Sequence, residues 1–372
     1  MSDHVALWLP TKRADLVQRA APDVAPGPGE ITVRARAVAV NPFDRYVQAI
    51  GDVITSYLRY PVVLGTDVAG DVVSVGAGVT RFRIGDRVLG HAAGLEKGRN
   101  RAAEGAFQEK VVLLAHMATP IPDGMPFQDA AVLPLGLSTA ACGLFQRDFL
   151  ALPPPRLDPV ATGEVMLVWG GSTSVGCNAI QLARAAGYEV VTTCLPHNFD
   201  LVRRLGAKQA FDYHSPTVKR DILAELQGRR CAGALSIGKG SAAACMDILA
   251  ACDGRRFVAQ VTPPASFDDV PPGRGRMRKL APAIAQMMFG NLSLMLRARR
   301  LGVATRMIWG GSLIDNEVGP LIYEMFLPQA LARGRYAAAP EPLVVGHGLG
   351  SVPEALERQR VGVSARKLVI TL

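Results

Sequence analysis

The turn Gly170–Gly176 has the residue types that bind phosphate groups. It reads GGSTSVG, follows the apolar run Val165–Trp169, and precedes residues with helical spacing, Cys177–Ala186. Small residues let a backbone approach a pyrophosphate, and a helix N-terminus offers free N–H groups and the positive end of its dipole. A second apolar run, Glu189–Thr193, completes a strand, turn, helix and strand. The unit predicts the phosphate-binding half of a dinucleotide fold, and a crossover that binds nothing is the minor alternative.

The residues after the second run indicate which dinucleotide is bound. In such folds an acidic residue at the end of the second strand holds the adenosine ribose hydroxyls. Here the strand is followed by CLPHN, without an acid, and then by Arg203, Arg204 and Lys208. A 2′-phosphate is repelled by a carboxylate and favoured by cations or amide donors. We therefore expect NADPH rather than NADH, the alternative being cations that only solvate a helix face.

The composition indicates a well-buried globular protein of two domains. The chain has 372 residues, of which 49% are hydrophobic, and a formal net charge of +9. The charge suits a nucleic acid or an anionic ligand, but no nucleic-acid motif accompanies it, so a phosphate-rich cofactor is the simpler explanation. The six cysteines form no CxxC pair, and neither a leader segment nor a long apolar span is evident. We expect a reduced, cytoplasmic protein without stable membrane insertion.

Apolar runs alternate with helical segments in the second half of the chain, which predicts a doubly wound parallel sheet. Shorter, glycine-punctuated runs before Pro122 predict an irregular β domain. We expect the two domains to span residues 129–324 and 1–128, the latter completed by 325–372. The strands expected in the parallel sheet are Val165–Trp169, Glu189–Thr193, Gln209–Tyr213, Ala232–Ile237, Arg256–Val261 and Thr305–Trp309.

Residues 262–304 are too many for one crossover, so an insertion is expected there. One hypothesis is a lid, apolar towards an acyl chain and basic towards CoA. A second is a helix on a membrane surface, because basic flanks beside an apolar face suit anionic lipids. A packed helix with solvated ends is the third. The basic residues that flank the apolar run Ala281–Leu296 are Arg274, Arg276, Arg278, Lys279, Arg297, Arg299 and Arg300.

Several segments together resemble the medium-chain dehydrogenase/reductase superfamily over nearly the whole chain. NPFD from Asn41, GTDVAGDVVSVGAGVTRFRIGDRV from Gly65 and LPLGLSTAACGLF from Leu133 are similar to its first domain. GGSTSVG, with the later LPHNFDLVRRLGAKQAFDY, looks most like the zinc-independent branch, near quinone oxidoreductases and trans-acting enoyl reductases. The resemblance implies an α/β protein with a GroES-like irregular β domain and a doubly wound, parallel-sheet Rossmann domain.

The resemblance also implies a set of site residues. The cofactor would meet the phosphate-binding turn, the segment after the second strand, and residues from both ends of the chain beside the nicotinamide. Substrate would meet Leu135 and Ser138. The implied cofactor residues are Asn41, Asp44, Thr139, Gly171, Ser172, Thr173, Ser174, Val175, Leu195, His197, Asn198, Arg203, Tyr213, Val261, Val363 and Ser364.

The chain departs from the zinc alcohol dehydrogenases of this superfamily, which place a cysteine near position 41, a His-Glu pair near 66 and four close cysteines near 95. It has Asn41, then Thr66 and Asp67, and no cysteine before Cys142. Zinc needs thiolate, imidazole or carboxylate ligands at a defined geometry. We therefore expect no metal site, and a structural turn role for Asp67.

Without a Lewis acid, reduction of an activated double bond or a quinone is expected in preference to alcohol oxidation. Hydride from the nicotinamide would add to the β-carbon of an enone or enoyl thioester. Hydrogen-bond donors would stabilise the enolate, and a proton would reach the α-carbon. Tyr57 is the candidate proton donor, with Tyr46, Tyr60 and solvent as rivals.

The predicted function is thus an NADPH-dependent reductase of a small molecule, free or linked to CoA or a carrier. An NADPH quinone reductase and a non-catalytic NADPH-binding protein are the alternatives. No nucleic-acid partner is expected. A homodimer is an option through the strand Thr305–Trp309, if it lies at a sheet edge.

Overall fold

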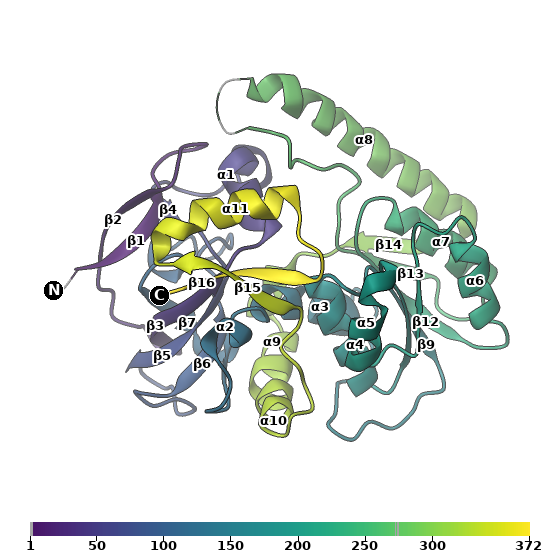
Figure 1. The fold of residues 1–372 in the computed structure, drawn as a ribbon, viewed down its shortest axis with the longest axis horizontal. Coiled ribbons are helices and arrows are strands. Elements are labelled where there is room, and N and C mark those ends of the chain that lie inside the picture. Colours follow the sequence, from purple (N-terminus) through teal and green to yellow (C-terminus); the bar gives the residue numbers. More distant parts are fainter. Residues whose placement is uncertain (1–2, 272, 274) are drawn as a thin grey trace. The chain divides into compact units, whose positions relative to one another are not determined.

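A computed structural model describes residues 3–271, 273 and 275–372 of the chain (Figure 1). The chain forms two compact units. Unit 1 comprises residues 1–135, 267–280 and 314–372, and unit 2 comprises residues 136–266 and 281–313. The boundaries expected from the sequence lie at residues 128 and 324, whereas in the structure the chain changes unit after Leu135 and after Leu313, and residues 267–280 of the expected insertion belong to unit 1.

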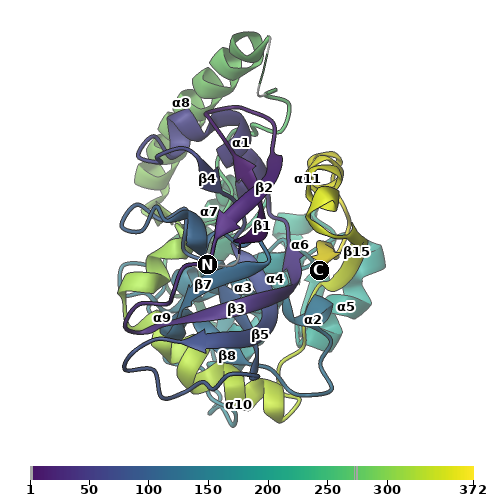
Figure 2. The ribbon, with the colours of Figure 1, turned by 90° about the vertical axis from the view of Figure 1, so that its left-hand side faces the viewer.

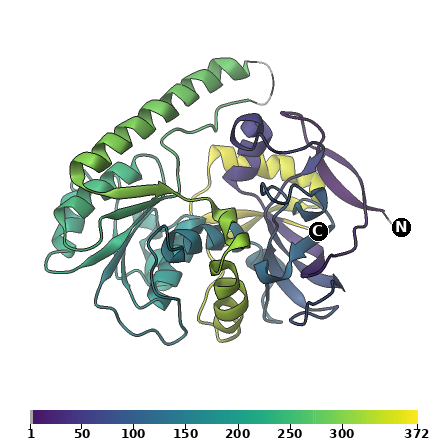
Figure 3. The same ribbon diagram turned by 180° about the vertical axis from the view of Figure 1, so that it is seen from behind.

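Unit 2 is built on one parallel sheet with the strand order β11-β10-β9-β12-β13-β14, seen from behind in Figure 3. Numbered along the chain, this is the doubly wound order in which the direction of winding reverses beside the first strand. All five residues of that first strand, Val165–Trp169, are buried, as the apolar run predicts for a strand covered on both faces. The strands are β9 (Val165–Trp169), β10 (Glu189–Thr193), β11 (Gln209–Phe211), β12 (Cys231–Ser236), β13 (Phe257–Gln260) and β14 (Ala304–Met307).

Helices connect these strands. Four of them, α4 to α7, each connect two consecutive strands from β9 to β13. Helix α8 connects β13 to β14 and fills most of the expected insertion as one helix of 26 residues. The helices are α3 (Pro134–Phe145), which crosses the boundary between the units, α4 (Ser174–Ala185), α5 (Phe199–Leu205), α6 (Val218–Glu225), α7 (Ser241–Ala251) and α8 (Arg276–Leu301). Among the described residues, no helix is long and apolar enough to cross a membrane.

Unit 1 contains a three-stranded sheet, β2-β1-β4, and a larger sheet in the order β15-β16-β3-β5-β6-β8, with β7 also paired to β3 (Figure 2). The C-terminal strand β16 pairs antiparallel with β3, so the two ends of the sequence share one sheet. The strands are β1 (Asp3–Leu9), β2 (Val17–Pro22), β3 (Glu30–Ala39), β4 (Val62–Val63), β5 (Asp67–Val75), β6 (Arg87–His91), β7 (Lys110–Leu114), β8 (Ala118–Pro120), β15 (Glu341–His347) and β16 (Arg366–Thr371).

Short helices complete unit 1. Helix α1 begins after Asn41, with Pro42 at its first position and Asp44 in its first turn, where a fixed φ and a negative charge both suit a helix start. The helices are α1 (Pro42–Ile54), α2 (Phe127–Ala130), α9 (Val318–Pro320), α10 (Leu327–Ala332) and α11 (Val352–Val361), with a π-helical segment, Leu321–Phe326, between α9 and α10. The structure thus confirms the predicted class, a GroES-like β unit with a parallel-sheet Rossmann unit.

Candidate functional site

The turn between β9 and α4 is too tight for side chains at its glycines. A Cβ atom on Gly171 would lie 2.1 Å from Thr192 Oγ1, and one on Gly176 would lie 2.2 Å from the carbonyl oxygen of Gly170. Gly170 itself has φ +90°, a left-handed conformation that glycine adopts without strain. The turn is therefore packed directly against β10 at Gly171.

Thr173 caps the helix that follows. Its Oγ1 accepts a hydrogen bond from the Gly176 N–H at 3.0 Å and donates to the Gly170 carbonyl at 2.8 Å. The turn residues Ser172, Thr173, Ser174 and Val175 are partly or fully exposed, whereas α4 from Gly176 to Ala183 is buried. The turn thus exposes small polar residues beside the start of a 12-residue helix, where the positive end of the helix dipole favours an anion such as a pyrophosphate.

The other cofactor residues predicted in unit 2 cluster at one edge of the sheet. Trp169, Thr193 and Phe211 are register partners at the ends of β9, β10 and β11, and Ser236 and Gln260 continue the row on β12 and β13. Ligands of doubly wound sheets bind outside this carboxyl edge. The predicted residues that follow these strand ends are Leu195, His197, Asn198, Tyr213 and Val261.

A cation lies near the end of β10, in helix α5. Arg203 is half-exposed and stacks 5.5 Å over the Phe199 ring, and its guanidinium is 3.9 Å from the carboxylate of the exposed Asp200. Asn198 is buried and His197 is exposed in the short 3-10 turn before α5. The tight turn, the helix start and this cation fit a dinucleotide, and the segment CLPHN directly after β10, which has no acidic residue, fits one with a 2′-phosphate.

In unit 1, Asn41 and Asp67 contact a buried lysine, Lys367, and Asn41 also contacts Thr66. Asn41 Nδ2 donates to Thr66 Oγ1 at 3.1 Å and to Asp67 Oδ2 at 2.9 Å. Lys367 Nζ donates to Asn41 Oδ1 and lies 2.8 Å from Asp67 Oδ2. The second carboxylate oxygen of Asp67 accepts the Leu135 N–H at 2.6 Å. All of these side chains are buried, so the network holds β5, β16 and the start of α1 together by charge-assisted hydrogen bonds.

Two further titratable groups lie beside this network. Asp44 accepts the Asn41 N–H at 2.8 Å. Burial raises the pKa of Asp44 to about 7; the Asn41 N–H and Lys367 oppose this, and the Asp67 carboxylate adds to it. His91, the register partner of Asp67, is fully buried, and burial lowers the pKa of His91 to about 4 against the attraction of Asp67. The site therefore holds a lysine ammonium, a carboxylate, a carboxyl that titrates near neutrality and a neutral imidazole.

Known proteins resemble this chain over its whole length. Residues 27–123 match the family model described as "Alcohol dehydrogenase GroES-like domain". A dehydrogenase of Aspergillus niger is 45% identical over 380 residues, covering 100% of both chains. The chain belongs to the medium-chain dehydrogenase/reductase superfamily. A trans-enoyl reductase of Aspergillus japonicus is 35% identical over 343 residues, covering 92% of this chain and 90% of its own.

The fold agrees with this membership. A mycobacterial protein whose structure was solved in complex with NADPH superposes with a TM-score of 0.66 at 21% sequence identity, and the match covers 100% of both chains. The relatives make this chain an oxidoreductase of the medium-chain dehydrogenase/reductase type. At this level of identity the solved structure supports the fold alone.

By the resemblance stated above, the network in unit 1 falls near the positions where zinc alcohol dehydrogenases of the superfamily would carry metal ligands: Asn41 near the cysteine, and Thr66 and Asp67 near the His-Glu pair. Asp67 is not a turn residue, as the sequence suggested, but the first residue of β5 and the centre of the network. Within the described part of the chain, no three His, Cys, Asp or Glu side chains are grouped so that they could hold a metal ion.

Lys367 is the site residue that sequence reasoning missed. Its signal is a lysine directly before the apolar run Leu368–Ile370 of β16, and its partner Asn41 is 326 residues away in the chain. Ammonium groups are rarely buried unless they are paired. A lysine inside an apolar terminal strand of this superfamily would therefore have pointed to a buried carboxylate.

The remaining predicted residues have simpler environments, and their roles stay predictions. The Tyr57 hydroxyl donates to the Leu95 carbonyl at 3.0 Å, and burial, followed by Glu96, raises the pKa of Tyr57 to about 12. In unit 2, Ser138 is buried and Thr139 is partly buried on α3. Val363 and Ser364 are exposed in the loop between α11 and β16.

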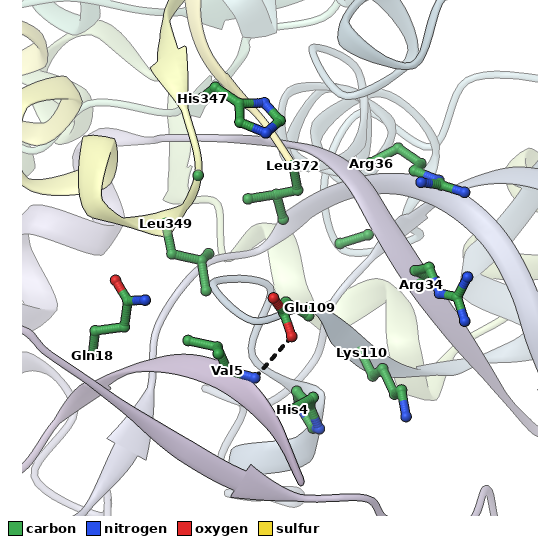
Figure 4. A pocket seen from close by; sticks show the side chains of 12 residues that line it. His4, Val5, Gln18, Arg34, Arg36, Glu109, Lys110, His347, Leu349 and Leu372 are labelled. Atoms are coloured by element: carbon green, nitrogen blue, oxygen red, sulfur yellow. Dashed lines mark hydrogen bonds between the residues drawn. The ribbon is translucent and has the colours of Figure 1, made fainter. Parts of the chain in front are cut away.

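A separate open cavity of about 530 Å³ in unit 1 contains none of the predicted site residues (Figure 4). Arg36 and Lys110 on its wall are paired with Asp71 and Asp23 at 2.7 and 2.5 Å. Their charge is thus largely neutralised, and the cavity does not join the network around Asp67.

Proposed function

We propose that the chain is a zinc-independent, NADPH-dependent reductase of activated carbon–carbon double bonds, acting on an enone or an enoyl thioester. The observation that carries the proposal is the buried contact of Lys367 with Asp67 and Asn41. An ammonium group at these positions neutralises the carboxylate that a metal would need, and it adds no Lewis acid. The superfamily reactions that do without a metal then remain, and the trans-enoyl reductase relative carries one of them in its name.

The cofactor would be held mainly by backbone. The N–H groups at the start of α4 would bind the pyrophosphate, with Ser172 and Thr173 exposed beside them. Arg203 would pair with the 2′-phosphate, and Leu195 and Tyr213 would border the adenine. When bound, NADPH supplies the hydride for the substrate β-carbon. The chain's own task is to orient that group, exclude water and stabilise the oxygen that becomes negative.

Unit 1 would supply polar groups at the reacting end. Asn41 and Lys367 form a hydrogen-bonded network with Asp67, in which the ammonium and the carboxylate neutralise each other. Tyr57 remains the candidate proton donor, and the raised pKa of this phenol means that it holds its proton at neutral pH. Solvent is the alternative donor, since the Tyr57 hydroxyl is engaged with the Leu95 carbonyl.

The decisive experiment is NADPH consumption by purified protein against paired substrates. Enoyl thioesters and simple enones are compared with naphthoquinones, with NADH as the control for cofactor preference and a zinc chelator as the control for metal dependence. Turnover of thioesters or enones, unaffected by the chelator, is expected. Turnover of quinones alone would favour the alternative, an NADPH quinone reductase. Tight NADPH binding without any turnover would favour a non-catalytic NADPH-binding protein.

A second experiment tests the cofactor choice through Arg203. We expect Arg203→Gln to weaken NADPH binding by roughly 10- to 100-fold, the range for losing a charged hydrogen bond, and to leave NADH binding unchanged. Arg204→Gln, on the same short helix, is the matched control. Equal losses for both cofactors would show that Arg203 supports the helix and does not read the phosphate. We also propose that the substrate is linked to CoA or a carrier. A homodimer through the edge strand β14 is a further part of the proposal, and both can be tested on the same purified protein.

A further inference from the structure

Helix α8 has one face that packs on unit 2. Ala298 is buried in the core cluster that includes Val303 and Leu249, and Leu294 and Leu301 pack against the same cluster. These positions recur at the spacing of three and four residues that defines one side of a helix. Residues 281–301 of the helix, the part that belongs to unit 2, are therefore fixed to that unit along this side, and their opposite side faces away from its core.

The opposite side is apolar in the middle of the helix. At about 100° per residue, the middle positions that point away from Leu294 and Ala298 form a continuous stripe. Each of its side chains is between 44% and 72% exposed. Monomeric soluble proteins rarely leave such a stripe uncovered. The stripe is formed by Met288, Phe289, Leu292, Met295 and Leu296.

Cations stand at both ends of the stripe, and α8 contains no Asp or Glu. Arg278 and Lys279 lie at one end and Arg299 and Arg300 at the other, and all four are exposed. The side chains of these four make no hydrogen bond or ion pair with any described residue. By contrast, Arg297 is neutralised by Asp247 at 2.5 Å. Arg274, noted in the sequence, lies outside the described residues.

The cations at both ends of the stripe limit which kind of surface can cover it. A second copy of α8, packed in either direction, would bring cationic ends against cationic ends without an acid to neutralise them. The complementary surface is apolar along the middle and negative at both flanks, over the roughly 30 Å that twenty residues of helix span. A bilayer with anionic headgroups has this character everywhere on its surface.

We propose that α8 docks the protein onto anionic membrane surfaces, with the stripe 288–296 among the outer acyl carbons and the four flanking cations among the headgroups. The helix would lie in the plane of the membrane and not cross it. The docking is independent of the reductase activity proposed above, since it uses none of the residues assigned to cofactor or substrate. It corresponds to the second of the three hypotheses for the insertion, the helix on a membrane surface.

Vesicle co-sedimentation of the full-length protein tests the proposal. Binding to phosphatidylcholine vesicles that contain phosphatidylserine is expected, with little binding to pure phosphatidylcholine and a loss at high salt, because salt screens the headgroup attraction. The double variant Arg299→Gln/Arg300→Gln should weaken binding about 30-fold, from roughly 1 kcal/mol per cation at an anionic surface. Phe289→Ser/Leu292→Ser should weaken it by at least about tenfold, because it removes inserted apolar side chains.

The control removes one exposed cation and one exposed apolar side chain that are not part of α8. Arg83→Gln/Ile84→Ser removes an exposed cation and a strongly exposed isoleucine from unit 1 and should leave vesicle binding unchanged. Wild-type binding by both α8 variants, or equal binding to neutral and anionic vesicles, would overturn the proposal. It would also be overturned if sedimentation equilibrium showed a dimer that Phe289→Ser/Leu292→Ser converts to monomer while no vesicle binding occurs, because a second copy would then cover the stripe.

Discussion

Replacement of Lys367 by methionine isolates the energetic role of the buried network. Methionine keeps the length and apolar stem of the side chain and removes only the ammonium. Asp67 is then left fully buried with its Oδ2 facing Asn41 Nδ2 alone, and Asn41 Oδ1 loses its donor. A buried carboxylate without its cation is far more costly than the pair itself is favourable.

The expected cost can be stated from this geometry. Breaking a buried ion pair from one side typically lowers the free energy of unfolding by about 3–5 kcal/mol. The 2.8 Å contact of Lys367 with Asp67, and their near-complete burial, place this pair among the fully desolvated ones. Lys367→Met/Asp67→Asn removes both charges and should recover more than half of the loss, because no net charge then stays buried. In that double variant the Leu135 N–H can still donate its hydrogen bond, now to the side-chain oxygen of the introduced asparagine.

The assay is a double-mutant cycle on urea and thermal unfolding of the full chain. Because the chain has two units, unfolding should be followed by amide exchange in β5 and β16 as well as by the transition midpoint. Additive losses in the two single variants and the double variant would refute the reasoning, since independent sites add and a charged pair does not. A stability change below about 1 kcal/mol in Lys367→Met would refute it as well, because that is the range of an exposed pair.

Three further outcomes follow from the structure. The pKa of Asp44 is about 7 in the fold against an ordinary value of 3.8, so the folded state binds the extra proton, and stability should fall as pH rises between these values. Asp44→Asn should flatten melting temperature across that window, and an unchanged slope would contradict the assignment. Gly171→Ala should weaken NADPH binding by about tenfold through overpacking against Thr192, and Thr192→Ala should restore part of it in isothermal titration. Native thiol labelling with mass spectrometry should modify Cys252 first, since burial raises the pKa of Cys177 to about 12; early modification of Cys177 would show that unit 2 opens.

The parallel sheet could be predicted because its strands carry their own signal. Val165–Trp169 and Glu189–Thr193 are runs of residues with no polar face, and the structure has the strands β9 and β10 at these bounds. Where the apolar run is shorter, the predicted end of the strand is less accurate. The third strand ends at Phe211 and not at Tyr213, because Asp212 accepts the His214 N–H and begins a turn.

The network in unit 1 was harder to predict because the residues that form it are far apart in the sequence. Neither the apolar pattern of β16 nor the turn before α1 shows that Lys367 meets Asn41 across 326 residues. Local periodicity reports which face of a strand is buried, and a charged residue on the buried face appears only as an exception to the pattern. The resemblance drew attention to Asn41 and Asp67, but a pattern of missing zinc ligands could not show that a lysine from the other end of the chain pairs with them.

The expected preference for NADPH depends on whether Arg203 is already neutralised by a carboxylate of the protein, and the structure gives the distance that bears on this. The sequence shows an acid, Asp200, only a few residues after β10, which would weaken the case for a 2′-phosphate if it neutralised Arg203. Their separation of 3.9 Å, with both side chains strongly exposed, is that of a loose surface pair worth well under about 1 kcal/mol. A phosphate dianion offers Arg203 a shorter, charge-assisted bond and would displace Asp200 at little cost. Removal of this competitor by Asp200→Asn should therefore leave the NADPH affinity within about twofold, and a much larger gain would mean that the carboxylate, not the phosphate, holds the guanidinium.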